Sequence, residues 1–313
     1  MIVSLDAGPE VVAVVPTLGR ELDRLRTCLE SILQSSFDGR LAVIVVWNDP
    51  RRPVPDLGQV TVLEPGINLG FPIALNSARN LVSAPFLWIV QDDQTVESDC
   101  LQVLVNRIQG IDLPAIVRPV VVNDAGKIPA TSCGGLLRDG GVTNEPYPLT
   151  DITPNQVDQD VRLDWVTLSG ALVRCEAWDE VGGMDPMYFP LQWSDIDFGY
   201  RISRIGFLVI LEPRARVTHE RFGSTPSVFR EYMSDRNQAY FIGKNSDGAV
   251  SVSTTIDEPT EAIQFIAREA SLLLIDFAGH AESQMQQLMN SRSMRLTRPL
   301  RALSMRLRKF RQE

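Results

Sequence analysis

Runs of apolar residues alternate with amphipathic segments through the first third of the chain. The runs are bulky and partly β-branched, which is typical of strands buried on both faces, and they cover Val11–Val15, Leu41–Trp47, Val60–Leu63 and Phe86–Val90. Between them, apolar positions recur at helical spacing over Glu21–Gln34 and from Ala74 to Leu81. This alternation predicts βαβ units and a mostly parallel α/β sheet flanked by helices.

The pattern is less regular beyond residue 100. A helix over Leu101–Ile108 and a strand over Ala115–Val122 are expected, whereas 123–160 is rich in Gly, Pro, Asp and Asn and predicts irregular loops or a hairpin. The apolar segment Trp165–Val173 is interrupted at Ser169 and Gly170, which suggests a strand that another group approaches closely. The later predicted elements are a helix ending at Arg204, short strands over Phe207–Leu211 and Ala215–Thr218, and a helix over Glu261–Met289.

Composition narrows the class of protein. The 313 residues can form one large α/β domain with a C-terminal extension, or two small domains. A net charge of −9 argues against a general nucleic-acid binder. The scattered cysteines Cys28, Cys100, Cys133 and Cys175 favour a reducing compartment. Without a signal-peptide pattern or an apolar run near the ~20 residues of a membrane helix, we expect a cytoplasmic protein or one resting on a membrane surface.

Polar residues follow three of the predicted strands. Pro16 and Thr17, Asn48, and the pair Asp92 and Asp93 all lie at carboxyl ends, which meet at one edge of a parallel sheet and form its ligand-binding crevice. Two adjacent carboxylates repel each other unless a cation offsets the charge, and hard divalent cations prefer carboxylate oxygen. The alternative is a solvated turn before the next helix, and the stretch alone favours neither.

Three later residues carry candidate chemistry. Asp195 lies at the start of a predicted helix beside Trp193, where apolar surface could raise its pKa towards that of a useful base. Asp197 has capping-box spacing from Ser194, which favours a structural role at the helix N-terminus. His219 follows a strand; a lone histidine there is more often structural than a ligand.

Nine motifs run in the order found in family 2 glycosyltransferases of the GT-A fold, which the chain resembles over roughly residues 11–240. They are Val-Val-Pro-Thr-Leu-Gly-Arg (14–20), Val-Val-Trp-Asn (45–48), Asn-Leu-Gly-Phe…Asn (68–76), Gln-Asp-Asp (91–93), Ser-Gly-Ala (169–171), Val-Gly-Gly-Met-Asp…Tyr-Phe (181–189), Trp-Ser-Asp-Ile-Asp…Arg (193–201), His219 and Tyr-Met-Ser-Asp-Arg-Asn (232–237). The last motif and Trp-x-Asp-x-Asp resemble galactofuranosyl- and rhamnosyltransferases in particular. We therefore expect a GT-A domain over 1–245, with a nucleotide-binding half to about 122 and an acceptor half from 123, and a helical extension over 246–313.

The resemblance implies roles for individual residues. Asp93 would hold Mn²⁺ or Mg²⁺ with His219, although Gln91 replaces the first acidic residue of the metal motif, and Asp195 would be the catalytic base. Trp47 stands where many relatives have an aspartate that reads the base, and Gly19 where asparagine is common. The expected contacts to the nucleotide sugar are Pro16, Thr17, Arg20, Trp47, Asn48, Asn68, Gly70, Asn76 and Asp92.

Acceptor contacts are expected from the second half of the domain, because aromatic faces suit sugar rings. The residues are Trp165, Ser169, Gly170, Tyr188, Trp193 and Asp197. A core role for each of the aromatic residues is an equally good interpretation.

The implied reaction is inverting, metal-dependent transfer from UDP-galactofuranose, dTDP-rhamnose or a similar donor to a hydroxyl of a glycan, lipid-linked or protein acceptor. One alternative is a sugar-nucleotide pyrophosphorylase, but its Gly-rich phosphate loop would have to be Pro16–Arg20, which holds a single glycine. Another is a non-catalytic nucleotide-sugar or glycan-binding module, which Gln91 favours weakly. Oligomerisation is left open.

The C-terminal extension ends in a basic segment. From Arg292 to Arg311 there are seven Arg and one Lys without Asp or Glu, interleaved with Met294, Leu296, Leu300, Leu303 and Leu307. A basic amphipathic helix on anionic lipid and a helix packed on an acidic protein surface are equally good interpretations.

Overall fold

The computed structural model describes residues 8–122, 134–138, 143–147, 161–219, 225–245 and 259–290. The chain divides after Asp257 into two compact units, of which the first holds the sheet and the candidate site. The basic segment 292–311 lies outside the described residues.

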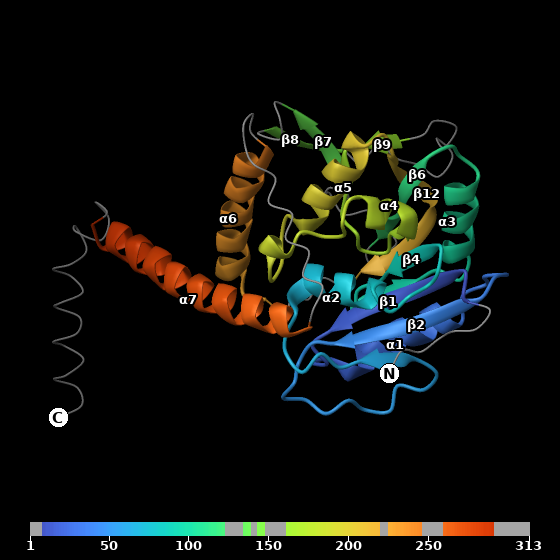
Figure 1. The fold of residues 1–313 in the computed structure, drawn as a ribbon, viewed down its shortest axis with the longest axis horizontal. Coiled ribbons are helices and arrows are strands. Elements are labelled where there is room, and N and C mark those ends of the chain that lie inside the picture. Colours follow the sequence, from blue (N-terminus) through green and yellow to red (C-terminus); the bar gives the residue numbers. More distant parts are fainter. Residues whose placement is uncertain are drawn as a thin grey trace, which may run out of the picture. The chain divides into compact units, whose positions relative to one another are not determined.

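The first unit is built on a large mixed sheet (Figure 1). Its first half is parallel, in the order β3 (Thr61–Leu63), β2 (Leu41–Trp47), β1 (Val11–Thr17) and β4 (Phe86–Ile89). The order continues through β11 (Leu172–Arg174), β6 (Pro114–Val122), β12 (Leu208–His219) and β5 (Gln94–Val96), and β9 (Val161–Leu163) also pairs with β12. Here β6 and β12 are parallel, whereas β11, β5 and β9 pair antiparallel with their neighbours.

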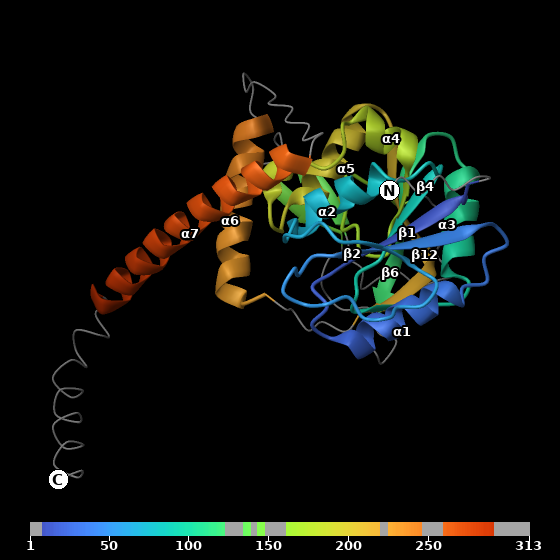
Figure 2. The same cartoon turned by 60° about the horizontal axis from the view of Figure 1, so that its bottom comes forward.

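Helices cover both faces of this sheet. Figure 2 shows α1 (Leu22–Leu33) on one face and α2 (Gly70–Arg79), α4 (Cys175–Glu180) and α5 (Ser194–Arg204) on the other. In α1 the predicted spacing puts Leu25, Leu29 and Ile32 on one buried stripe. Strands β1 and β4 are buried on both faces, as their unbroken apolar runs predict.

Several elements differ from the sequence prediction. The Asp92–Asp93 turn is followed first by the short strand β5 and only then by α3 (Cys100–Gln109). The two strands expected after Phe207 are one, β12, whose register shifts between Glu212 and Arg216. The predicted strand over Trp165–Val173 is two, β10 (Trp165–Val166) and β11, and β10 pairs with the hairpin of β7 (Gly134–Arg138) and β8 (Thr143–Pro146) in a second small sheet.

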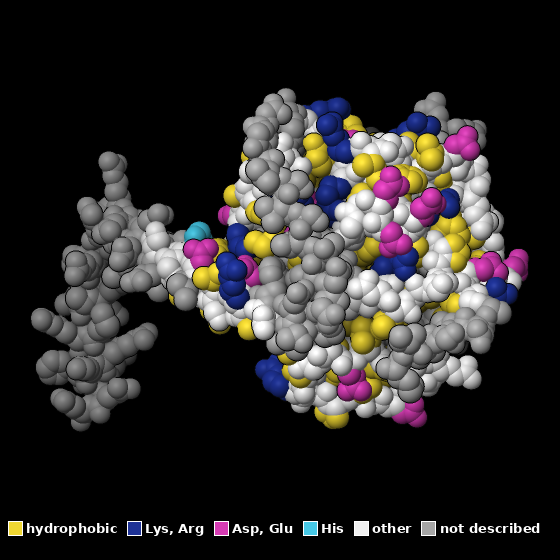
Figure 3. All heavy atoms as spheres, in the orientation of Figure 1, with side chains coloured by type: hydrophobic (Ala, Val, Ile, Leu, Met, Phe, Trp, Pro, Cys, Tyr) yellow, Lys and Arg dark blue, Asp and Glu magenta, His cyan; other side chains and the backbone are white. Residues whose placement is uncertain are grey.

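The remaining elements are helical. The short 3-10 helix η4 (Pro186–Tyr188) precedes α5, and α6 (Ser227–Asn245) follows β12. The second unit contains α7 (Pro259–Asn290), and none of the helices in the described ranges is both long and apolar enough to cross a membrane. On the visible face of the molecule, acidic and basic side chains are interspersed (Figure 3).

Candidate active site

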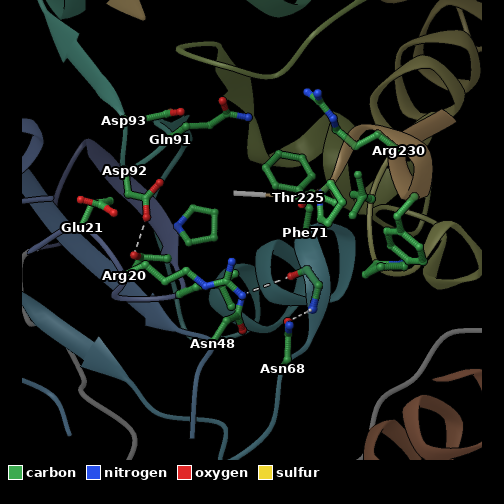
Figure 4. Close-up of a pocket in the computed structure, with 18 of the residues that line it drawn as sticks. Arg20, Glu21, Asn48, Asn68, Phe71, Gln91, Asp92, Asp93, Thr225 and Arg230 are labelled. Atoms are coloured by element: carbon green, nitrogen blue, oxygen red, sulfur yellow. Dashed lines mark hydrogen bonds between the residues drawn. The ribbon is translucent and has the colours of Figure 1, made fainter. Parts of the chain in front are cut away.

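A cavity of about 490 Å³ lies at the carboxyl ends of the parallel strands (Figure 4). Strand β1 contributes Pro16 and Thr17, the end of β2 contributes Asn48, and the turn after β4 contributes Asp92 and Asp93. The register explains this meeting, because Thr17 lies opposite Trp47 and the backbone N–H of Asn48 donates to the Thr17 carbonyl at 2.7 Å. The structure thus brings the three predicted polar clusters to one site.

Thr17 and Asp92 are joined directly. The Thr17 hydroxyl donates to Asp92 Oδ2 at 2.5 Å and accepts from the Gly19 backbone N–H at 2.9 Å. Burial raises the pKa of Asp92, and the hydrogen bond from Thr17 opposes that shift. Asp92 is therefore held in one orientation by β1, the strand that pairs with β4.

Asp93 is paired with His219. Strand β12 pairs with β5 so that His219 lies opposite Gln94, and this puts His219 Nε2 3.0 Å from Asp93 Oδ1. A carboxylate and an imidazole fit Mn²⁺ or Mg²⁺ as two protein ligands. Within the described ranges no three His, Cys, Asp or Glu side chains form a metal site by themselves, so substrate phosphates and water would have to complete the coordination.

The residues expected around the nucleotide divide into two sets. Arg20, Asn68 and Gly70 line the cavity with Asn48, whose amide donates to the Gly70 carbonyl at 3.2 Å. A side chain at Gly70 would clash, since its Cβ would lie 2.7 Å from the Pro190 carbonyl oxygen, and its φ is +64°. This close approach sets the loop around Pro190 against the start of α2.

Trp47 and Asn76 do not line the cavity. Trp47 is buried and packs against Gly19, where a Cβ would lie 2.3 Å from the indole ring. Asn76 exchanges two hydrogen bonds with the Met184 backbone, at 2.7 and 2.9 Å. Both residues therefore contact other parts of the protein and lie outside the cavity lining.

Asp195 is the second residue of α5, and Trp193 is the N-cap residue. Gln192 and Trp193 both have φ near +70°, which is strained for non-glycine residues. Burial raises the pKa of Asp195 to about 6, and its carboxylate accepts from the Ile196 backbone N–H at 3.0 Å. Asp195 does not itself line the cavity, but Leu191 in the loop before it does.

Asp197 lies in a buried network. It accepts from Arg201 Nε at 2.7 Å, Lys244 Nζ at 2.7 Å and the Tyr188 hydroxyl at 3.2 Å. The predicted capping box is wrong, because Trp193 caps the helix without a side-chain bond and the Asp197 carboxylate is drawn to these cations instead. Asp197 thus has three side-chain partners and no exposure to the cavity.

The other expected acceptor residues are also buried. Trp165, Tyr188 and Trp193 belong to one hydrophobic cluster that Ile196 and Phe241 complete. Ser169 is buried too, and among the described residues its hydroxyl has no hydrogen-bond partner. Gly170 donates its N–H to the Ile89 carbonyl at 2.7 Å, which joins this turn to the end of β4.

Sequence reasoning missed the wall that α6 and the residues before it supply. Thr225, Pro226, Phe229 and Arg230 line the cavity opposite the acidic pair. The motif at 232–237 lies within α6, but the sequence pattern predicted no helix there, and no spacing in the sequence indicates which helix lines the cavity. Glu21, Arg24 and Phe71 are further lining residues that were not predicted.

Comparisons with solved structures agree with this class of fold. The structure resembles GalNAc-T7 bound to UDP, GalNAc and Mn²⁺ with a TM-score of 0.56 at 14% identity, over 75% of this chain and 48% of that one. It resembles S. aureus TarS with a TM-score of 0.51 at 14% identity, over 83% of this chain and 42% of that one. The predicted GT-A fold is confirmed.

The family follows from the sequence match. The model of the family described as glycosyltransferase like family 2 matches residues 9–241, and the chain belongs to this family. The membership favours a transferase over the pyrophosphorylase considered from the sequence.

Two curated relatives are similar over parts of their length. An N-acetylglucosaminyl-diphospho-decaprenol L-rhamnosyltransferase of Mycobacterium tuberculosis is 31% identical over 80 residues, 26% of each chain. The O-antigen biosynthesis protein RfbC of Myxococcus xanthus is 26% identical over 239 residues, 69% of this chain and 18% of that protein. The matches thus span about a quarter or less of these relatives.

Proposed function

We propose that this protein is an inverting, metal-dependent glycosyltransferase. Its donor is a nucleoside diphosphate sugar such as UDP-galactofuranose or dTDP-rhamnose, and its acceptor is a hydroxyl of a glycan, lipid-linked or protein substrate. The observation that carries the proposal is the meeting of Thr17, Asp92, Asp93 and His219 at the strand ends beside one cavity.

The cavity wall suits a nucleotide diphosphate. Asn48 and Thr17 line the cavity at the ends of β2 and β1, where nucleotides bind in open α/β sheets. Asp93 and His219 would hold Mn²⁺ or Mg²⁺ beside them. When bound, the metal ion supplies positive charge that offsets the charge growing on the leaving diphosphate.

Asp195 suits the role of base. The acceptor oxygen attacks the anomeric carbon, the bond from that carbon to the diphosphate oxygen breaks, and the acceptor proton passes to the Asp195 carboxylate. A pKa of about 6 keeps the carboxylate ionised at neutral pH while making it a better proton acceptor than an exposed aspartate. A single displacement inverts the configuration at the anomeric carbon.

A lipid-linked glycan is the acceptor class to test first. The name of the mycobacterial relative gives a diphospholipid-linked N-acetylglucosamine as its acceptor, and the family match supports a transfer of the same kind here. The buried cluster of Trp165, Tyr188 and Trp193 supports the region around Asp195 from behind rather than offering a free aromatic face.

The experiment is a panel of UDP-, GDP- and dTDP-sugars with and without Mn²⁺. We expect one donor to raise the melting temperature in a metal-dependent way and then to be hydrolysed slowly in the absence of acceptor. The product of transfer to a supplied acceptor, analysed by NMR, should have the anomeric configuration opposite to that of the donor. Stabilisation by no donor in the panel, with or without metal, would contradict the proposal.

A further inference from the structure

The first turn of α6 faces the acidic edge of the cavity. Figure 4 shows Asp92 and Asp93 on one wall and Arg230 with Thr225 on the opposite wall. Arg230 is exposed and lines the cavity, and Phe229 beside it is partly buried. A basic side chain from the second half of the domain therefore borders the same space as the strand-end carboxylates.

The charges of the cavity are unevenly distributed. Arg20, Arg24 and Glu21 come from the segment that follows β1, on the same side of the cavity as Asp92. Among the described lining residues, Arg230 is the basic side chain that the opposite wall supplies, and no carboxylate in the described ranges lies within ion-pairing distance of it.

Helix α6 is fixed to the loop that leads to Asp195. The Asn237 amide donates to the carbonyls of Leu191 and Gln192, both at 2.9 Å, and the Trp193 indole N–H donates to the Ser234 hydroxyl at 3.2 Å. Leu191 itself lines the cavity. The backbone that carries Arg230 is thus held in a defined place relative to the candidate base.

We propose that Arg230 binds the diphosphate of the donor from the wall opposite Asp93. The inference rests on the proposed function. A nucleoside diphosphate brings negative charge to an edge that already holds two carboxylates, and a guanidinium offers forked donors whose charge does not depend on a bound metal ion. As the bond to the sugar breaks, charge grows on the diphosphate, so the contact strengthens in the transition state.

The test is nucleotide binding by calorimetry with UDP, GDP and dTDP as probes, each compared with its monophosphate and nucleoside. Arg230→Gln should weaken binding of the preferred diphosphate by about 10- to 100-fold, with a smaller effect on the monophosphate and none on the nucleoside. Arg230→Lys should restore part of the affinity. The matched control is Arg26→Gln, which removes the same charge from a half-exposed position on α1 outside the cavity and should bind as the wild type does.

The possible outcomes distinguish a failure of the Arg230 inference from a failure of the proposed function. Equal diphosphate affinity in Arg230→Gln and wild type would overturn the inference and leave the proposed function standing. An equal loss for diphosphate, monophosphate and nucleoside would also overturn it, because that pattern indicates a general disturbance of the fold. A change confined to the KM of a diphospholipid acceptor would overturn the assignment to the donor. A wild-type chain that binds none of the nucleotides would overturn the proposed function and the inference together.

Discussion

His219 Nε2 lies 3.0 Å from Asp93 Oδ1, although His219 ends β12 and Asp93 follows β4. The antiparallel pairing of β12 with β5 brings them together, since β5 starts at Gln94, directly after Asp93, and Gln94 lies opposite His219. The register between β12 and β5 therefore brings the two candidate metal ligands together.

Replacing His219 tests the proposed metal site. We expect His219→Ala to raise the Mn²⁺ concentration needed for half-maximal activity by 10-fold or more, because the ion loses a protein ligand. A metal titration of donor hydrolysis measures this. The other histidine of the chain, His280 on α7, provides the control, and His280→Ala should titrate as the wild type does. Identical metal curves for the three proteins would exclude His219 from the metal site.

The pH dependence of turnover tests Asp195 as the base. Its pKa is raised to about 6, so the ionised form that accepts a proton is lost as the pH falls below about 6. We expect log kcat to fall with unit slope below that pH in the wild type. Asp195→Asn should lose roughly 100-fold or more of turnover while keeping its affinity for the nucleotide. As a control, Asp23→Asn on the exposed face of α1 should keep the wild-type profile. Substantial turnover by Asp195→Asn would remove Asp195 from this role.

The raised pKa of Asp195 should also make the free energy of unfolding depend on pH. Because its folded pKa is raised, the folded state holds a proton that the unfolded state releases between about pH 4 and pH 6, so this group makes stability fall as the pH rises through that window. Above pH 6 the charge on this partly buried carboxylate costs about 1–3 kcal/mol. Asp195→Asn should therefore unfold at higher urea than the wild type at pH 7, and the gap should close at pH 4. A variant less stable than the wild type at pH 7 would contradict the predicted sign.

The parallel half of the sheet could be predicted because β2 and β4 are unbroken apolar runs and β1 is one as far as Pro16, whereas the edge strand β3 is short and only partly buried. The positions of Thr17, Asn48, Asp92 and Asp93 follow from it, since strand ends in such a sheet share one edge. The short strand β5 (Gln94–Val96) could not be predicted, because three residues show no periodicity and the strand is defined by its pairing with the distant β12. Long-range hydrogen bonds leave no pattern in the sequence, and the two bonds between Asn76 and the Met184 backbone could not be predicted from it.

Asn237 should control the strained loop before Asp195. Its amide donates to the carbonyls of Leu191 and Gln192, and it is completely buried. Asn237→Leu would leave both carbonyls without that donor next to two residues in the left-handed region, at a cost of about 2–3 kcal/mol in unfolding free energy. We also expect kcat to fall more than nucleotide affinity. The matched control is Asn245→Leu at the end of the same helix, where the amide donates to the Phe241 carbonyl of its own helix at 2.9 Å. Equal stability of the two variants would show that the loop does not depend on Asn237.

Lys244 forms hydrogen bonds with two buried carboxylates, Asp185 at the start of η4 and Asp197 in α5. Its ammonium donates to Asp185 Oδ2 at 2.8 Å and to Asp197 Oδ1 at 2.7 Å, and the two carboxylates are almost completely buried. Lys244→Met keeps the aliphatic stem but leaves these charges with less compensation, so we expect a loss of about 3–5 kcal/mol in urea unfolding.

A double-mutant cycle separates this ion pair from simple packing. Asp185→Asn removes one of the two charges that Lys244 neutralises, so the double variant should lose about 1–3 kcal/mol less than the sum of the single variants. Arg204→Met at the exposed end of α5 removes a positive charge without a buried partner and should change stability by no more than about 0.5 kcal/mol. Additive losses at Lys244 and Asp185 would mean that the two side chains act independently. In that case the link between α6 and the segment before Asp195 would rest on its other bonds, among them those of Asn237, Ser234 and Arg236.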